Sequence, residues 1–388
     1  MGVLAVLASI YSHLLALRFD RQVSTRLNQP HSDFQPRVCV VMACKGNENG
    51  LPENIEAILN QEYPNYRLII ITDTIRDSAY AIAQSALNRH PTIDAHLYTS
   101  HAHPNASGKV AALLTALERD GWASDAYAFV DSDAFTPSRW LKDIVDPLWD
   151  PWVGATTGFR WYFPVGGFWS HVESAWNASG TNLMFDERYS FPWGGAMAIL
   201  TQKLKEIDIR RVWEGAISDD LSLNAALRDH NYRTIFLPQC TVATYNQANM
   251  RSFLKWATRQ VALTKAFNRR LWTYGSAAYA FFTAVAALGV VSLTVGLISS
   301  KVWLLPAVLL FAPSILGVFR SNKRITTFKR AMPEFAADFD RNRWVDSVAS
   351  LIVPWVMTYC IFKSVRMTEI DWQGRKYKLG GQNTLAST

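Results

Sequence analysis

The sequence has few cysteines: Cys39, Cys44, Cys240 and Cys360 are the only ones among its 388 residues. Their spacing fits neither a paired zinc knuckle nor a disulfide framework, so small metal-stapled and disulfide-rich domains are excluded. We expect buried thiols in a reducing compartment. The chain also lacks internal repeats and low-complexity stretches. Its net charge of +7 suits anionic lipid, a phosphate-bearing substrate or nucleic acid, but nothing besides charge favours nucleic acid, so no such partner is expected.

Apolar segments that nearly lack charge lie at both ends and predict attachment to a membrane. Residues 1–20 predict an N-terminal anchor helix, with an interfacial helix as the alternative. Residues 274–320 contain two uncharged runs, each long enough to span, and predict two transmembrane helices. Residues 344–362 are a third C-terminal candidate, either a span or a re-entrant segment, because they contain Asp346 and Pro354. Three or four spans are therefore expected.

Basic residues flank these apolar segments. Residues 321–343 are rich in Lys and Arg, which is typical of a cytoplasmic loop, and residues 363–388 form a basic tail. Residues 249–273 combine basic and aromatic side chains at helical spacing. They predict an amphipathic interface helix on anionic lipid, with a domain helix whose charges are solvated as the alternative. The chain is predicted to be an integral membrane protein whose soluble domain faces the cytoplasm.

The central region, residues 35–248, alternates short apolar runs with helical patterns. Four strands are predicted, with helices between them, over Val38–Met42, Leu68–Thr72, His96–Thr99 and Tyr127–Val130. Such alternation predicts an α/β fold with a doubly wound, mostly parallel sheet. In these sheets ligands bind beyond the carboxyl ends of the strands, so the chemistry is expected just after Met42, Thr72 and Val130.

Aspartates occupy the ends of two of these strands. Asp73 follows the second strand, and Asp131 and Asp133 follow the fourth. The last two project to the same side of an extended chain and suit a divalent cation, Mg²⁺ or Mn²⁺, that neutralises a diphosphate. Asp219 and Asp220 precede a helical run, and Asp220 is a candidate general base. A single such Asp is often only a turn or a helix cap, so the prediction depends on the set lying together.

Other candidates come from loops and helix starts. Lys109 opens a helix and predicts an anion site, with a solvated lysine as the alternative. Gly194 and Gly195, which follow Trp193, predict a tight turn that packs beside a ligand, with a plain loop as the alternative. Together with Trp193 and Arg160 they are candidate walls for an acceptor.

Several motifs occur in the order that one known enzyme family shows. They are the loop Lys45-Gly46, the segment from Leu51 to Tyr66 that ends Gln-Glu-Tyr-Pro-Asn-Tyr, and the residues Asp73, Lys109, Asp131, Asp133 and Asp220. With these pieces the chain resembles the family 2 inverting glycosyltransferases, and within them the ceramide glucosyltransferase-like group, from about Arg37 to Phe267. The resemblance implies a GT-A (Rossmann-like) fold, a UDP-sugar donor, a divalent cation and catalysis at the cytoplasmic membrane face. It also implies roles for three residues: Asp73 and Asp131 touch the nucleotide, and Asp220 is the catalytic base.

One motif departs from that family. Its last motif, Gln or Arg, two variable residues and then Arg-Trp, here reads Ser252-Phe253-Leu254-Lys255-Trp256. Lys255 replaces an arginine to which it is not equivalent at a bidentate phosphate site, and Arg251 and Arg259 are the candidate replacements. Together these features predict transfer of one sugar, glucose by the resemblance, to a ceramide-like or diacylglycerol-like lipid.

Other functions and the oligomeric state stay open at this point. A processive polysaccharide synthase of the same superfamily is the main alternative, although it needs a channel of several spans. A non-catalytic nucleotide-binding protein would not need the intact set of aspartates. A nucleotidyltransferase would need a Gly-rich phosphate loop after the first strand, which is missing.

Overall fold

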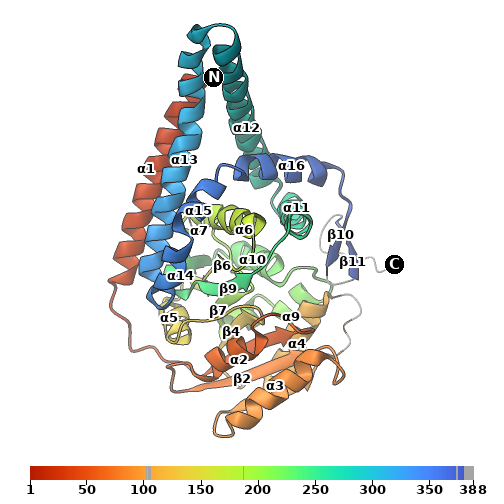
Figure 1. Ribbon diagram of the computed structural model, residues 1–388. Helices are drawn as coiled ribbons and strands as arrows, with labels where there is room; N and C mark the ends of the chain where they lie inside the picture. Colours follow the sequence, from red (N-terminus) through yellow and green to blue (C-terminus); the bar gives the residue numbers. More distant parts are fainter. Residues whose placement is uncertain (102, 104–105, 187, 373–374, 380–388) are drawn as a thin grey trace. The chain divides into compact units, whose positions relative to one another are not determined.

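The computed structural model describes residues 1–101, 103, 106–186, 188–372 and 375–379 (Figure 1). The chain divides into two compact units, each built from segments that are distant in sequence. The helical unit comprises Met1–Thr25, Phe163–Asn182 and Asn246–Asp371, and the sheet unit comprises Arg26–Tyr162, Leu183–Tyr245 and the residues from Trp372 onward.

A seven-stranded sheet organises the sheet unit, with the strand order β3-β2-β1-β4-β7-β5-β8. The strands are β1 (Val38–Cys44), β2 (Tyr66–Thr72), β3 (Ala95–Thr99), β4 (Ala126–Asp131), β5 (Val153–Thr157), β7 (Ala196–Leu200) and β8 (Arg233–Phe236). The first four in this order pair in parallel, β7 runs antiparallel to both of its neighbours, and β5 is parallel to β8. The predicted α/β class with a mostly parallel sheet is confirmed, and the four predicted strands correspond to β1–β4.

Helices pack on both faces of this sheet. They are α2 (Leu51–Leu59), α3 (Ser78–Arg89), α4 (Gly108–Asp120), α5 (Trp140–Val145), α8 (Thr201–Glu206), α9 (Ile209–Trp213) and α10 (Asp219–Asp229), with 3-10 turns at Asp146–Trp149 and Pro238–Cys240. Val40 and Met42 of β1 belong to a core shared with α2, α3 and α5, whereas Cys39 and Val41 belong to a second core shared with α4, α9 and α10. Burial on both faces explains why β1 is an uninterrupted apolar run. All four cysteines are buried free thiols, as expected.

The helical unit contains the candidate spans. Its helices are α1 (Gly2–Leu27), α6 (Phe168–Ser179), α11 (Met250–Phe267), α12 (Arg269–Ile298), α13 (Leu304–Ala331), α14 (Ala336–Arg341), α15 (Arg343–Ala349) and α16 (Val353–Val365), with 3-10 turns at Lys301–Trp303 and Pro333–Phe335. Four short elements lie where the chain passes between the units: β6 (Arg160–Pro164), α7 (Thr181–Met184), β9 (Val242–Asn246) and β10 (Glu369–Trp372). The strand β11 (Arg375–Lys378) follows.

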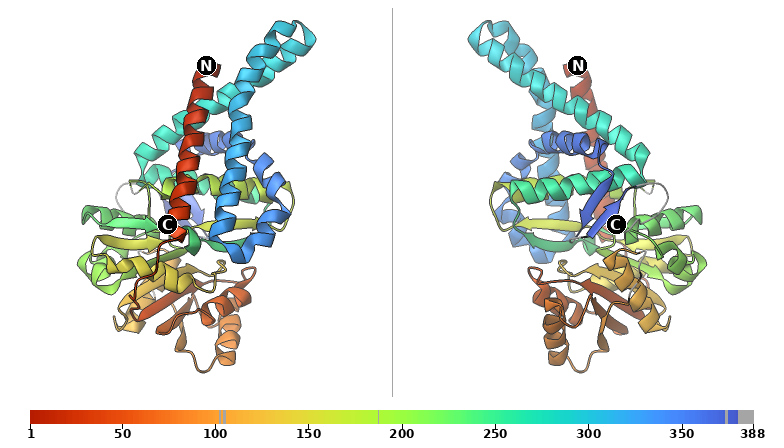
Figure 2. Two further views of the ribbon diagram at one scale, coloured as in Figure 1. Left: turned by 90° about the vertical axis from the view of Figure 1, so that its left-hand side faces the viewer. Right: turned by 90° about the vertical axis from the view of Figure 1, so that its right-hand side faces the viewer.

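Within the part of the chain that the structure describes, three helices are long and apolar enough to cross a membrane: α1, α12 and Lys301–Ala331, which includes α13. The pair α15 and α16 passes the same test together but is bent by 48°, so it is a broken span or a re-entrant loop. The expected three or four candidate spans are therefore present. α12 and α13 form a hairpin (Figure 2). α1 extends past the predicted residues 1–20, and its Asp20 contacts α13 through Lys323 Nζ at 2.7 Å.

The predicted interface helix over residues 249–273 differs from the structure in two ways. The first helix, α11, ends at Phe267, because Asn268 leaves the helical conformation and its side chain accepts a hydrogen bond from Leu271 N (3.0 Å) to begin α12. The apolar face of α11, including Phe253 and Val261, is buried in the core of the helical unit. That face is therefore not available to lipid, and the alternative interpretation, a domain helix, describes α11 better.

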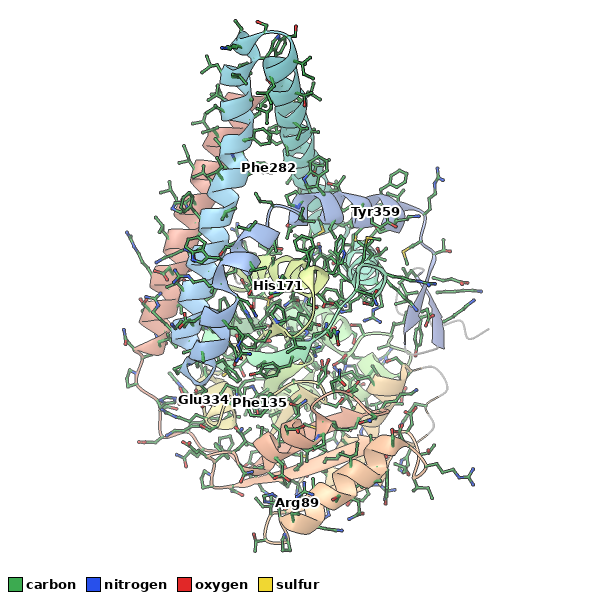
Figure 3. The ribbon with its side chains drawn as sticks, viewed as in Figure 1. Arg89, Phe135, His171, Phe282, Glu334 and Tyr359 are labelled. Atoms are coloured by element: carbon green, nitrogen blue, oxygen red, sulfur yellow. The ribbon has the colours of Figure 1, made fainter. Side chains whose placement is uncertain are left out.

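The segment Phe163–Asn182 lies inside residues 35–248 but groups with the helical unit. Val172 and Trp176 of α6 share a buried core with α11 and α16. His171 of α6, labelled in Figure 3, also contacts Asp346 of α15, with Nδ1 and Oδ1 2.7 Å apart. Of the predicted basic tail 363–388, residues 373–374 and 380–388 lie outside the described residues.

Candidate active site

The parallel register brings three strand ends to one edge of the sheet. Cys44 of β1 pairs with Thr72 of β2, and Ala43 pairs with Asp131 of β4. Lys45 and Asp73 directly follow β1 and β2, and their side chains form an ion pair with Nζ and Oδ2 2.8 Å apart. The carboxyl ends of these strands therefore carry charged groups, as the sequence predicted from the positions of the aspartates.

Arg160 joins the two aspartates that follow β4. Its Nη2 lies 2.8 Å from Asp131 Oδ2 and 2.6 Å from Asp133 Oδ1, and its Nη1 donates to Asp133 Oδ2 at 2.6 Å. The guanidinium therefore binds Asp133 with both prongs of its fork and reaches Asp131 with one of them. The Asp-x-Asp spacing predicted a divalent cation at these carboxylates; the structure places an arginine there, and the metal site stays a prediction.

Lys109 extends this network to a second loop. Its Nζ lies 2.7 Å from Asp131 Oδ1, 3.1 Å from Asp219 Oδ2 and 3.1 Å from the Gly194 carbonyl oxygen. The helix start that carries it is capped by Ser107, whose hydroxyl accepts from Val110 N at 3.3 Å. The sequence predicted an anion site at this lysine; in the structure its ammonium lies against two carboxylates of the protein, and the site for a ligand anion stays a prediction.

These contacts shift the protonation of the network. Burial alone would raise the pKa of Asp131, but the charges of Lys109 and Arg160 outweigh it and hold that pKa below its ordinary value. Burial likewise would lower the pKa of Lys109, but the charges of Asp131 and Asp219 raise it. Both groups are therefore charged at neutral pH.

Asp219 and Asp220 begin α10, the position where carboxylates suit a helix dipole. Asp219 is buried and held by Lys109, whereas Asp220 is partly exposed. Asp220 Oδ1 accepts hydrogen bonds from its own helix at Leu221 N (2.7 Å) and from the Ser218 hydroxyl. Burial and the charge of Asp219 raise the pKa of Asp220 to about 6, which suits a group that accepts a proton near neutral pH.

The glycine pair after Trp193 permits close approach to this network. A Cβ on Gly194 would overlap with Asp219 Oδ2, and a Cβ on Gly195 would lie 2.6 Å from Asp131 Oδ2. The Trp193 ring lies 5.0 Å from the Arg160 guanidinium, close enough for a cation–π contact. The structure thus brings the predicted Arg160, Trp193, Gly194 and Gly195 together with the aspartates.

Glu48 is a site residue that the sequence analysis missed. It lies in the loop between β1 and α2, and its carboxylate accepts a hydrogen bond from the hydroxyl of Ser132, between the two aspartates. Burial and the charge of Asp133 raise its pKa to about 7. Its position in the loop after the first strand could have predicted it, by the same rule on the carboxyl ends of strands that selected Asp73.

The remaining predicted residues, Lys255, Trp256 and Arg259, belong to the helical unit on α11. Lys255 Nζ lies 3.2 Å from Asp371 Oδ2, and the Trp256 ring packs at 5.1 Å from that of Trp176. Lys255 is thus an exposed partner of a carboxylate within its own unit.

The carboxylate pair fits the divalent cation that the resemblance implies. Among the described residues, no group of three or more His, Cys, Asp or Glu side chains could hold a metal ion. Mg²⁺ and Mn²⁺ at nucleotide sites commonly take one or two carboxylates and complete their shell with phosphate and water oxygens. One cationic nitrogen already touches both Asp131 and Asp133, so a single ion can reach both carboxylates.

This α/β unit carries acidic side chains at the carboxyl ends of parallel strands, which is where ligands bind in such sheets. The chain belongs to glycosyl transferase family 21, whose sequence profile matches residues 1–385. This confirms the resemblance identified in the sequence.

Individual relatives are more distant. The chain is 25% identical over 137 residues to ceramide glucosyltransferase 3 of Caenorhabditis elegans, and the match covers 34% of this chain and 30% of that relative. Among solved structures, a mannosyltransferase from Pyrobaculum calidifontis in complex with GDP-Man and Mn²⁺ aligns with a TM-score of 0.43, 17% identity and coverage of 92% and 99% of the two chains. A mycobacterial protein aligns with a TM-score of 0.39, 16% identity and coverage of 59% and 74%.

Replacement of Gly194 by alanine should destabilise the sheet unit. The added Cβ displaces the Asp219 carboxylate and strains its pair with Lys109, and we expect a loss of about 1–3 kcal/mol, as overpacking of a dense site typically gives. Thermal unfolding of the detergent-solubilised protein measures the change. Gly167→Ala is the matched control, because nothing lies within 4 Å of a Cβ there. Equal melting temperatures for the two variants would contradict the packing argument.

Proposed function

We propose that the protein is an inverting glycosyltransferase that moves one sugar, glucose, from a UDP-sugar to the hydroxyl of a membrane lipid at the cytoplasmic face. The observation that carries this proposal is the joined network of Asp131, Asp133 and Asp219 with Lys109 and Arg160 at the carboxyl end of a parallel sheet. Family membership supports glycosyl transfer as the reaction. The ceramide glucosyltransferase relative supports glucose and, of the ceramide-like and diacylglycerol-like lipids, the ceramide-like one.

Asp220 is the proposed base. Its partly exposed carboxylate takes the proton of the acceptor hydroxyl, and the acceptor oxygen attacks the anomeric carbon from the side opposite the diphosphate. The bond from that carbon to the diphosphate oxygen breaks, UDP leaves with the bonding electrons, and the anomeric configuration inverts. Lys109 fixes Asp219 beside the base, and the negative charge of Asp219 keeps Asp220 more basic than an ordinary aspartate.

The other residues of the site hold the donor in this proposal. Asp131 and Asp133 would hold Mg²⁺ or Mn²⁺, and the bound ion would neutralise charge on the departing diphosphate. Lys109 and Arg160 add fixed positive charge at the same place. Lys45 and Asp73, paired at the neighbouring strand ends, are assigned to the nucleotide. Lys255, Trp256 and Arg259 are assigned to the acceptor or the diphosphate.

The membrane assignment draws on the helical unit. Three apolar helices are long enough to span a bilayer, and the basic residues at 321–343 begin within the C-terminal part of the last of them, Lys301–Ala331, and continue beyond it. Because Lys and Arg are enriched in short cytoplasmic loops, this segment supports a cytoplasmic position for the catalytic unit.

Incubation with labelled donors tests the proposal directly. Membranes that contain the protein are supplied with UDP-glucose, UDP-galactose or UDP-N-acetylglucosamine plus Mn²⁺, and the lipids are extracted. We expect label from UDP-glucose in a lipid that carries one sugar. A long labelled polymer would instead favour a polysaccharide synthase, and label that never enters lipid would refute a lipid acceptor.

The variant Asp220→Asn should abolish transfer and leave UDP binding nearly unchanged. The amide keeps the shape of the side chain but cannot accept the acceptor proton, so the rate should fall by at least about 100-fold. Asp229→Asn, an exposed change at the far end of the same helix, is the control and should keep wild-type activity. Substantial transfer by Asp220→Asn would remove Asp220 from its role.

The rate should also depend on pH through the same carboxylate. Asp220 acts when it is ionised, and its pKa is raised to about 6, so kcat/KM should rise with pH and level off above it. Below the pKa, the ionised fraction falls about tenfold for each pH unit. UDP binding measured over the same pH range distinguishes protonation of the base from weaker binding of the donor. A flat rate down to about pH 5 would contradict the assignment.

A further inference from the structure

Arg160 occupies the position between the two carboxylates that the proposed cation would need. Its Nη2 alone contacts Asp131 at 2.8 Å and Asp133 at 2.6 Å. Both oxygens of Asp133 are engaged by the guanidinium. The second oxygen of Asp131 is engaged by Lys109. All four carboxylate oxygens therefore already have a cationic partner within the protein.

A divalent cation and this guanidinium cannot share the pair. Two cations drawn to the same carboxylate oxygens would lie within a few ångströms of each other, where like charges in a partly buried site repel strongly. The side chain of Arg160 is only about a tenth exposed (11%), and a guanidinium keeps its positive charge in proteins. The arginine therefore stays charged, and it can yield the site only by moving.

The surroundings offer Arg160 a second set of partners. The Trp193 and Tyr162 rings lie 5.0 and 5.5 Å from its guanidinium carbon, and the Tyr162 hydroxyl lies 3.3 Å from Nη1. These rings can hold the guanidinium by cation–π contacts after it leaves the carboxylates. A diphosphate provides the oxygens that a guanidinium fork binds best.

We propose that Arg160 is a built-in counter-ion that keeps the carboxylate pair closed to metal in the free protein and transfers to the diphosphate when the donor binds. The inference rests on the proposed function, which supplies the diphosphate and the metal. In this proposal Arg160 is a positioning residue that couples the binding of metal to the binding of donor. Metal alone binds weakly, because Arg160 occupies the carboxylates. When the donor draws Arg160 away, metal and donor bind together.

Titration of Mn²⁺ on the purified full chain, followed by the electron paramagnetic resonance of free Mn²⁺, tests this coupling. For the wild type we expect weak binding that UDP strengthens by about tenfold or more. For Arg160→Gln we expect Mn²⁺ to bind about tenfold more tightly without UDP, and UDP to add little. A misfolded variant would bind Mn²⁺ less tightly, so an increase in Mn²⁺ affinity cannot be explained by loss of structure.

Two further variants complete the comparison. Arg233→Gln removes a positive charge from an exposed pair with Asp150 in the same unit and should bind Mn²⁺ as the wild type does. In the Arg160→Gln background, Asp133→Asn should remove the tight site. If Arg160→Gln does not fold, Arg160→Lys keeps the charge but loses the fork, and it should bind Mn²⁺ several-fold more tightly than the wild type without UDP.

The outcomes separate this proposal from the proposed function. A folded Arg160 variant that binds Mn²⁺ no more tightly than the wild type overturns the counter-ion role, and transfer of sugar by the wild type would still support the enzyme. A wild type that neither transfers sugar nor binds Mn²⁺ in the presence of UDP removes the proposed function instead.

Discussion

Charge balance among partly or fully buried carboxylates is the constraint on which the candidate site depends. Asp131 and Asp133 lie at and just after the end of β4, Asp219 and Asp220 begin α10, and Lys109 and Arg160 join Asp131, Asp133 and Asp219. Removing a charge from water costs several kcal/mol unless it is paired, so these cations allow the end of β4 and the start of α10 to carry carboxylates side by side. When all are ionised, the carboxylates outnumber the cations by two. A divalent cation would balance that excess.

The close fit around these ion pairs explains the neighbouring sequence. Gly194 and Gly195 lie where a Cβ would meet Asp219 and Asp131, so the turn that follows Trp193 can approach the carboxylates only with glycine. The Gly194 carbonyl then accepts from Lys109, and the Gly195 carbonyl accepts from the backbone of Asp131. The backbone of residues 194 and 195 therefore contacts the ion-paired side chains directly, which explains why two glycines follow Trp193.

Much of the fold could be predicted because its signals are local. Apolar runs gave β1 to β4, and the rule that ligands bind at the carboxyl ends of parallel strands selected Asp73 and Asp131 before any contact was known. The partners of Lys109 and Arg160 could not be predicted, because they join residues 22 to 110 positions apart whose meeting depends on β7, α10 and their loops. The spacing of apolar residues in α11 predicted an apolar face, but an apolar face has the same sequence pattern whether it packs against protein or against lipid. Glu48 was missed because a single acidic residue in a loop has no distinctive pattern.

The alternation of segments between the two units has a consequence for biosynthesis. Residues 26–162 leave the ribosome before α6, and α6 must wait for α11 and α16, which are translated much later. During this interval Val172 and Trp176 lack the neighbours that cover them in the folded protein. The nascent chain therefore exposes an apolar surface to which chaperones or the membrane-insertion machinery can bind. A shortened chain that ends before α11, made in the hope of a soluble enzyme, would carry this surface permanently.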